Sequence, residues 1–285
     1  MKRIAEMLSV SRSNLYARHR RDSDLCGRRS YHKVEDEGLL PMIRAIVDER
    51  PTYGYPRTTA MLNRRLRILG KARVNHKRVY RIMKRNGLLL ERHSGGPGRV
   101  HEGEIITSVS NLRWCSDIFE IMCWNGEGIR VAFVMDCCDR EIISYLASTS
   151  GISGEMIRDL MTEAIEARFG SVDRVPRRIE WLSDNGPAYI ATETKRFGAS
   201  VGLVLCRTPI ESPESNGMAE AFVKTFKRDY VALHRLDHPQ GVLEQLPDWF
   251  NDYNENHPHR GLKMMSPREY RQSLTQLTEC PVSWG

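Results

Sequence analysis

The order of apolar runs after residue 112 limits the possible folds more than any other feature of this sequence. Three strand-like runs follow one another, namely RWCSDIFEIMC, IRVAFVMDCC and EIISYLAS. A helical segment, a fourth strand (RRIEWL), another helix and a short final strand (GLVLCR) come next. Three antiparallel strands followed by alternating helices and strands predict an α/β domain with a mixed sheet.

The first third of the chain is expected to be helical. Apolar residues recur at helical spacing in GLLPMIRAIVDER, PRTTAMLNRRLRIL and VNHKRVYRIMKRNGLL, which together predict a small helical domain. Upstream, IAEMLSVSRSNLYAR predicts two short helices joined by a turn. They resemble the tail of a larger helix-turn-helix unit, because alone they are too small to bury a core. The stretch HSGGPGR after the third helix predicts a linker.

Positive charge is concentrated in this helical third. Residues 1–100 hold 24 Lys and Arg against 9 Asp and Glu, whereas the remainder holds 19 against 27. Between Glu49 and Glu91 there are twelve Lys and Arg and no acidic residue. A charged run is most often a solvated face, but a basic block free of carboxylates is typical of a protein that binds a phosphate backbone.

The third helix of this block carries its cations beside its apolar stripe. We expect these side chains to contact DNA, with the helix in a groove. They are Lys77, Arg78, Arg81, Lys84 and Arg85.

Composition argues against a membrane or secreted protein. No run of 18 apolar residues occurs and the N-terminus has no apolar signal core, so we expect a cytoplasmic protein with no membrane partner. The seven cysteines include the adjacent Cys137 and Cys138 but form no CxxC, which favours reduced, buried thiols over disulfides or zinc. His257 and His259 are expected in a loop and not as metal ligands.

Three carboxylates lie where chemistry is expected. Asp117 falls within the first strand, Asp184 just after the fourth strand, and Glu220 on a late helix. Functional groups gather at the carboxyl ends of strands in open α/β sheets. Each acid also has a structural interpretation: Asp117 as a polar strand residue, Asp184 as the start of a turn, and Glu220 as part of a solvated helix face.

The sequences around these acids carry a family resemblance. RWCSDIFEI, WLSDNGPAY and SPESNGMAEAFVKTFKRDY resemble the second-frame (OrfB) transposases of the IS-three family of bacterial insertion sequences. This family belongs to the DDE transposase and retroviral integrase superfamily. DCCDRE resembles its insertion-sequence-two-like subgroup, and PTYGYPR and YNENHPHRGLKMMSPREY extend the likeness over nearly the whole chain. The resemblance implies a ribonuclease-H-like core, a mixed five-stranded sheet flanked by helices, preceded by a small helix-turn-helix-type DNA-binding domain.

The resemblance also implies the reaction and its catalytic residues. Asp117, Asp184 and Glu220 would hold Mg²⁺ or Mn²⁺, with two ions expected, and catalyse DNA cleavage and strand transfer of the element's ends. Magnesium prefers oxygen ligands and is usually held by one or two carboxylates plus substrate phosphates. Two ions about 3.5 to 4 Å apart can stabilise both the attacking and the leaving oxygen.

The helix of Glu220 is expected to contact DNA as well. Lys224 and Lys227 follow Glu220 on the same helix face, and lysines at these positions contact DNA ends in the resembled family. Asn216 either orients a phosphate or a metal-bound water, or caps the helix. Asn185 is expected in a turn.

The expected partners follow from the family. They are double-stranded DNA of the terminal repeats and of the target, further copies of this chain on paired ends, and an upstream-frame protein, present as a separate partner or a frameshift fusion.

The expected organisation has five segments. They are a partial helix-turn-helix segment (1–30), a helical DNA-binding domain (36–92), a linker (93–108), a ribonuclease-H-like integrase catalytic core (109–235) and a C-terminal helical extension (236–285).

Two other functions stay open from the residues alone. A DNA-binding regulator or architectural protein with a catalytically inert α/β domain would explain the basic block. A ribonuclease H acting on RNA–DNA hybrids would explain the sheet but not the basic block. Asp136 and Asp139 are expected to be structural, and Trp114 and Trp181 to lie in the core.

Overall fold

The computed structural model describes residues 36–91, 107–170, 175–184, 186–207 and 217–279. The expected helix-turn-helix segment (1–30), most of the expected linker, Asn185 and Asn216 lie outside the described residues.

The basic block forms three helices: α3 (Leu40–Glu49), α4 (Tyr55–Ile68) and α5 (His76–Arg85). Their apolar faces meet in one small core, which includes Ile43 and Leu62. The Asn75 side chain caps α5 by accepting a hydrogen bond from the Lys77 N–H. This cap satisfies one backbone donor that the first turn of a helix leaves free.

A single five-stranded sheet forms the centre of the rest of the molecule. Its strands are β1 (Arg113–Met122), β2 (Gly128–Asp136), β3 (Ile142–Ser148), β4 (Ile179–Ser183) and β5 (Leu203–Arg207), in the order β3-β2-β1-β4-β5. The pairs β1–β2 and β2–β3 are antiparallel, whereas β1–β4 and β4–β5 are parallel. The predicted mixed sheet is confirmed.

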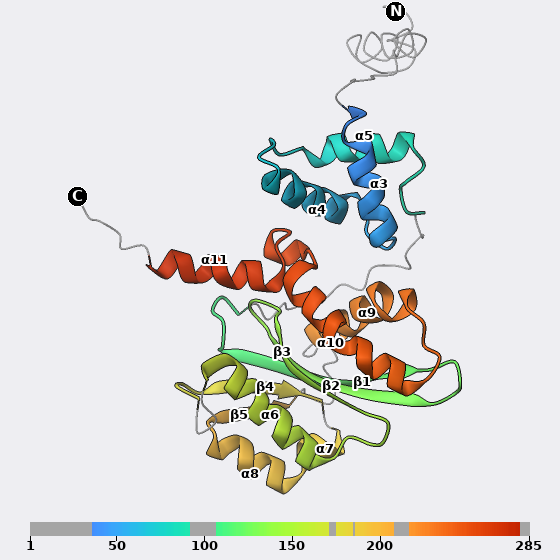
Figure 1. The fold of residues 1–285 in the computed structure, drawn as a ribbon. Coiled ribbons are helices and arrows are strands. Elements are labelled where there is room, and N and C mark those ends of the chain that lie inside the picture. Colours follow the sequence, from blue (N-terminus) through green and yellow to red (C-terminus); the bar gives the residue numbers. More distant parts are fainter. Residues whose placement is uncertain (1–35, 92–106, 171–174, 185, 208–216, 280–285) are drawn as a thin grey trace, which may run out of the picture.

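Helices cover both faces of this sheet (Figure 1). One face packs against α6 (Gly154–Phe169), α7 (Pro187–Ile190) and α8 (Thr192–Ser200), and the other against α9 (Gly217–Asp229) and α10 (Pro239–Asn256). Strand side chains alternate between the two faces. In β1, Trp114 therefore lies in the α6 core, whereas its neighbour Cys115 lies in the α9 core.

Both tryptophans expected in the core are fully buried, at 0% exposure for Trp114 and Trp181. Among the described cysteines, Cys115, Cys123, Cys137 and Cys138 are buried thiols, as predicted, whereas Cys206 is only partly buried. No helix within the described ranges is long and apolar enough to cross a membrane.

The C-terminal segment packs closely on the sheet. We predicted residues 236–285 as a C-terminal helical extension, and its first helix, α10, contributes Leu246 and Phe250 to the α9 core. The ring of Phe250 stacks on Tyr145 of β3 with centroids 3.9 Å apart. After α10, the chain forms a 3-10 turn, η4 (Arg260–Leu262), and then α11 (Pro267–Glu279).

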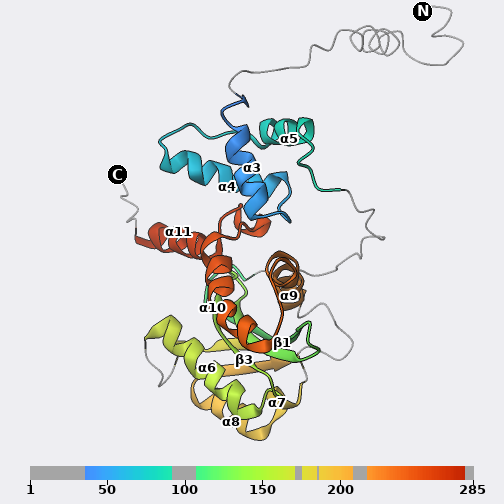
Figure 2. The ribbon, with the colours of Figure 1, turned by 45° about the vertical axis from the view of Figure 1, so that its right-hand side comes forward.

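The three-helix domain rests on this C-terminal segment in both views (Figures 1 and 2). Arg50 pairs with Asp252 of α10 at 2.5 Å, and Arg57 with Asp229 at the end of α9 at 3.1 Å. The Tyr53 hydroxyl lies 2.9 Å from His257 Nδ1. Burial holds the pKa of His257 well below its usual value, so the imidazole is neutral in this interface.

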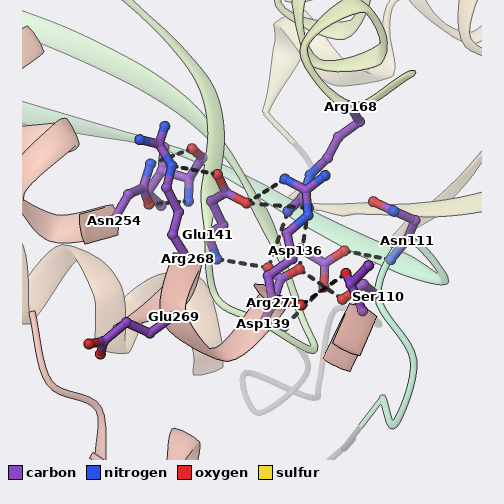
Figure 3. A network of polar contacts seen from close by, with 12 residues as sticks. Ser110, Asn111, Asp136, Asp139, Glu141, Arg168, Asn254, Arg268, Glu269 and Arg271 are labelled. Atoms are coloured by element: carbon purple, nitrogen blue, oxygen red, sulfur yellow. Dashed lines mark hydrogen bonds and ion pairs between the residues drawn. The ribbon is translucent and has the colours of Figure 1, made fainter. Parts of the chain in front are cut away.

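A buried charge network joins the turn after β2 to α6 and α11 (Figure 3). Asp139 accepts hydrogen bonds from both terminal nitrogens of Arg168, and Glu141 pairs with Arg168, Arg268 and Arg271. Asp136 accepts the backbone N–H groups of neighbouring turn residues and of Asn111. Asp136 and Asp139 are therefore structural, as predicted, and DCCDRE ties the sheet to the C-terminal segment.

Candidate active site

Strand register places Asp117 next to Asp184. In the parallel β1–β4 pair, Trp114 lies opposite Trp181 and Cys115 opposite Leu182. The same register carried two residues further brings Asp117 level with Asp184, at the carboxyl end of β4. Parallel neighbours lie about 4.8 Å apart, and side chains two residues apart share a face. Because Cys115 and Leu182 both lie in the α9 core, the two aspartates belong to the face that α9 covers.

Helix α9 supplies the third carboxylate over this face. Its buried residues pack on the sheet: the Phe222 ring lies 4.5 Å from that of Phe133, the residue paired with Asp117 across β1–β2. Glu220 lies in the first turn of α9 and its side chain is exposed. Lys224 and Lys227 are exposed further along the same helix, and Lys227 Nζ lies 5.9 Å from the ring centroid of Phe119 in β1.

Electrostatics connects the three acids. Burial raises the pKa of Asp117 to about 6, and the nearby Asp184 and Glu220 carboxylates raise it as well. A hydrogen bond of 2.8 Å from the Ile118 N–H opposes this rise by stabilising the charged form. The pKa of Asp117 therefore depends on both of the other carboxylates.

Two neighbours of the aspartates were not identified from the sequence. Asp184 Oδ1 accepts a hydrogen bond of 3.1 Å from the Gly186 N–H, and a Cβ at residue 186 would lie 3.0 Å from the same oxygen. The Tyr189 hydroxyl lies 2.6 Å from Ser116 Oγ, beneath the aspartates. Burial raises the pKa of Tyr189, so this phenol stays neutral. The Ser116–Tyr189 pair joins residues 73 positions apart, a separation that no local pattern reveals.

The donor set fits a hard divalent cation, although the side chains are not gathered into a finished site. Among the residues that the structure describes, no group of three or more His, Cys, Asp or Glu is arranged to hold a metal ion. Carboxylate oxygens are the ligands Mg²⁺ prefers. Burial contributes most to the raised pKa of Asp117 and the neighbouring carboxylates add to it, and a bound cation would stabilise the charged form against both effects.

A cleft of about 440 Å³ opens beside Asp184 along the edge strand β5. Arg178 and Lys195 line it together with Tyr189 and residues of β5. Positive side chains next to a carboxylate at a strand end suit a substrate that brings phosphates.

The basic face predicted on α5 is present in the structure. Lys77, Arg81, Lys84 and Arg85 are exposed. Arg78 is half-buried, and its Nε donates to Asp36 Oδ1 at 2.6 Å, so this guanidinium also anchors the segment that precedes α3. Contact of the five side chains with DNA stays a prediction.

Family comparisons match the chain over most of its length. A model described as an HTH-like domain matches residues 33–94, and two described as an integrase core domain match residues 108–213 and 203–267.

Named relatives match equally broadly. Transposase InsD for insertion element IS2A/D/F/H/I/K of Escherichia coli is 46% identical over 272 residues, covering 94% of this chain and 89% of that protein. Transposase InsD for insertion element IS2D of Escherichia coli strain K12 matches to the same extent.

Solved structures with a similar arrangement include the catalytic core domain of BIV integrase, at 15% identity and a TM-score of 0.42 over 59% of this chain and 99% of that one. The catalytic domain of Mos1 mariner transposase matches at 15% identity and a TM-score of 0.44, over 58% of this chain and 82% of that one.

Proposed function

Because this chain belongs to the insertion-element transposases, with an HTH-like domain before an integrase core, we propose that Asp117, Asp184 and Glu220 form its catalytic site. The reaction is cleavage of DNA at the ends of the chain's own insertion sequence, followed by strand transfer into target DNA in the bacterial cytoplasm. The observation that supports this most is the β1–β4 register, which aligns Asp117 with Asp184 under the helix that carries Glu220.

Each carboxylate has a distinct task in this proposal. Asp117 is fixed on a central strand, and Asp184 is oriented by the Gly186 N–H, so both present oxygens from a rigid base. Glu220 completes the set from α9, whose position depends on the packing of Phe222 and Phe226 on the sheet. Bound Mg²⁺ or Mn²⁺, with two ions proposed, would supply Lewis-acid stabilisation of the attacking and leaving oxygens.

The cations of α9 orient the substrate. Lys224 and Lys227 lie one and two turns after Glu220, where they would follow the phosphodiester backbone of the DNA end. The nucleophile is a hydroxyl of water or of a DNA 3′ end, so no covalent bond to the protein is needed. Asn216, directly before α9, is proposed to orient a phosphate or cap the helix.

The exposed face of α5 is proposed to grip the terminal repeat through Lys77, Arg81, Lys84 and Arg85, with Arg78 in a shared structural role. Assembly of several copies on paired ends, and cooperation with an upstream-frame protein, are likewise proposed from family membership.

Single alanine substitutions test the catalytic assignment. We expect Asp117→Ala, Asp184→Ala and Glu220→Ala each to keep binding to a labelled insertion-sequence end and to lose Mg²⁺-dependent cleavage by at least about 10³-fold, since each removes a carboxylate of the metal site. Glu166→Ala, an exposed acid on the opposite face of the sheet, is the matched control and should retain activity.

The same experiment separates the alternatives. Residual strand transfer in any triad variant would count against the assignment. Binding without nicking by the unaltered protein in Mg²⁺ would favour an inert DNA-binding regulator, and degradation of an RNA–DNA hybrid in place of DNA nicking would favour a ribonuclease H.

A further inference from the structure

A second basic surface lies between the three-helix domain and the C-terminal segment. It is a groove of about 950 Å³, lined on one side by α4 and the start of α5 and on the other by η4 and the turn after it. Four lining side chains are cationic or can become so: Arg73, His76, Arg260 and Lys263. No Asp or Glu is among the described residues that line it.

The wall from the three-helix domain is held in one conformation. The Asn63 amide donates to the Val74 carbonyl at 3.0 Å, and its oxygen accepts the Val74 N–H at 2.8 Å. The His76 ring stacks on Tyr55, with centroids 6.3 Å apart. Arg73 is therefore presented from a fixed loop and His76 from the first turn of α5.

The opposite wall contains unusual backbone. Lys263 and Met264 adopt left-handed φ values of 55° and 64°, which non-glycine residues seldom do. Hydrogen bonds from the Leu262 and Met264 N–H groups to the His259 carbonyl, 3.1 and 2.8 Å long, hold this turn. Such strain is concentrated at functional sites, where the surrounding structure maintains it. In this turn, the left-handed backbone places Lys263 next to Arg260.

The two walls are fastened to each other. The Arg64 guanidinium of α4 donates to the Asn256 carbonyl at 2.5 Å and pairs with Glu269 of α11. The Tyr53–His257 hydrogen bond adds a buried contact to the same interface. The groove is therefore preformed, and a ligand that spans it need not order it first.

The groove also lies at the end of α5 that faces DNA in helix-turn-helix proteins. Asn75 and His76, at the N-terminus of α5, line it. The N-terminal residues of a recognition helix contact base edges in the major groove of DNA. The phosphate backbone that borders this major groove must then pass close to the same end of the helix. The partial positive charge of a helix N-terminus favours phosphate in addition.

We propose that this groove binds the phosphate backbone of the terminal duplex, with Arg260 and Lys263 of the C-terminal segment extending the grip of the three-helix domain. The proposal rests on the proposed function, because the duplex is the transposase's substrate. It assigns a DNA contact to the C-terminal segment, and it makes the bound DNA bridge the two parts of the molecule.

Salt-dependent binding tests the proposal without any cleavage. The full chain in EDTA is titrated against two labelled duplexes, one copied from the end of the insertion element that encodes it and one of unrelated sequence, over a series of NaCl concentrations. We expect Arg260→Gln plus Lys263→Gln to weaken binding to both duplexes by the same factor. The slope of log affinity against log salt is negative, and its magnitude should decrease by about 0.9 for each phosphate that the variant no longer neutralises, or by about two in all.

The matched control is Arg44→Gln, an exposed cation on α3 outside the groove. It should leave the slope unchanged, and circular dichroism verifies that every variant is folded. If the double variant keeps the slope of the unaltered chain, or if Arg44→Gln reduces the slope equally, the proposed DNA contact in the groove is wrong. The proposed function would stand in either case. Failure of the unaltered chain to bind either duplex would overturn both.

Discussion

Asp117 is half-buried on a central strand and lies close to two other carboxylates. Its ionised form is therefore disfavoured in the folded protein, and the pKa rises to about 6 from an ordinary value near 3.8. Active sites often accept such unfavourable charge, because the ligand that relieves it is the one they bind.

This shift predicts that Asp117→Asn stabilises the metal-free protein at pH 8. The folded-state pKa is above the unfolded value, so ionised Asp117 opposes folding above about pH 6 and ceases to do so as pH falls toward 4. The melting temperature of the variant should exceed that of the unaltered chain at pH 8, and the two should converge by about pH 4.

Burial also raises the pKa of Asp136 to about 6, but Asp136 is present in both proteins and its contribution cancels in the difference. Mg²⁺ should raise the melting temperature of the unaltered chain more than that of the variant. A lower melting temperature for Asp117→Asn at pH 8 would show that the ionised Asp117 side chain does not oppose folding.

The sequence indicates the three carboxylates of the proposed site, but not the residues that contact them. Asp117, Asp184 and Glu220 are recognisable because each lies in a distinctive local sequence. The Ser116–Tyr189 hydrogen bond and the contact of Gly186 with Asp184 depend on how distant backbones approach, which the local patterns do not encode.

Among the elements, α6 contributes a charged residue to the interior. Arg168 lies near its C-terminus, and its side chain is 1% exposed between Asp139 and Glu141. Both carboxylates are themselves almost fully buried. A buried charge cluster of this kind is stable only while its partners are all present.

Replacing Arg168 by Met should therefore destabilise the protein by about 3 to 5 kcal/mol, because the buried Asp139 loses this counterion and Glu141 loses one of its three. Urea denaturation of the full chain measures the change. Arg158→Met is the control on the same helix: its partner Glu193 is 79% exposed, so its loss should change stability by less than about 1 kcal/mol. Equal effects of the two substitutions would contradict the structural role of the network.

Element positions were largely predictable. The apolar runs predicted all five strands. In β2 the run reflects burial on both faces of the sheet, since Val131 to Asp136 are all buried, whereas alternating burial is limited to the second half of β1. One helix was expected between β4 and β5, but the structure has two, α7 and α8. Four residues of α7 are too few to show a helical period, and its role in holding Tyr189 becomes visible only in three dimensions.

For the whole molecule, the three-helix domain and the C-terminal segment form one interface. The sequence suggested two separate helical regions at opposite ends of the chain. Ion pairs between residues about 200 positions apart, such as Arg64 with Glu269, have no local signature.

A double-mutant cycle on Arg64 and Glu269 should show energetic coupling between the two parts. The pair is mostly shielded, with side chains 17% and 29% exposed, so we expect a coupling of about 0.5 kcal/mol or more in the free energy of unfolding. The local pair Arg235 and Asp237, 81% and 48% exposed, is the control and should show weaker coupling. Strict additivity for Arg64 and Glu269 would mean that the domains do not support each other.

The central claim, that Asp117, Asp184 and Glu220 together hold the catalytic ions, is tested most directly by anomalous scattering from crystals of the DNA-bound protein soaked in Mn²⁺. We expect manganese peaks within coordination distance of oxygens from all three side chains, with a DNA phosphate completing the ligands. Manganese bound elsewhere, or Glu220 directed away from both aspartates while DNA occupies the site, would contradict it.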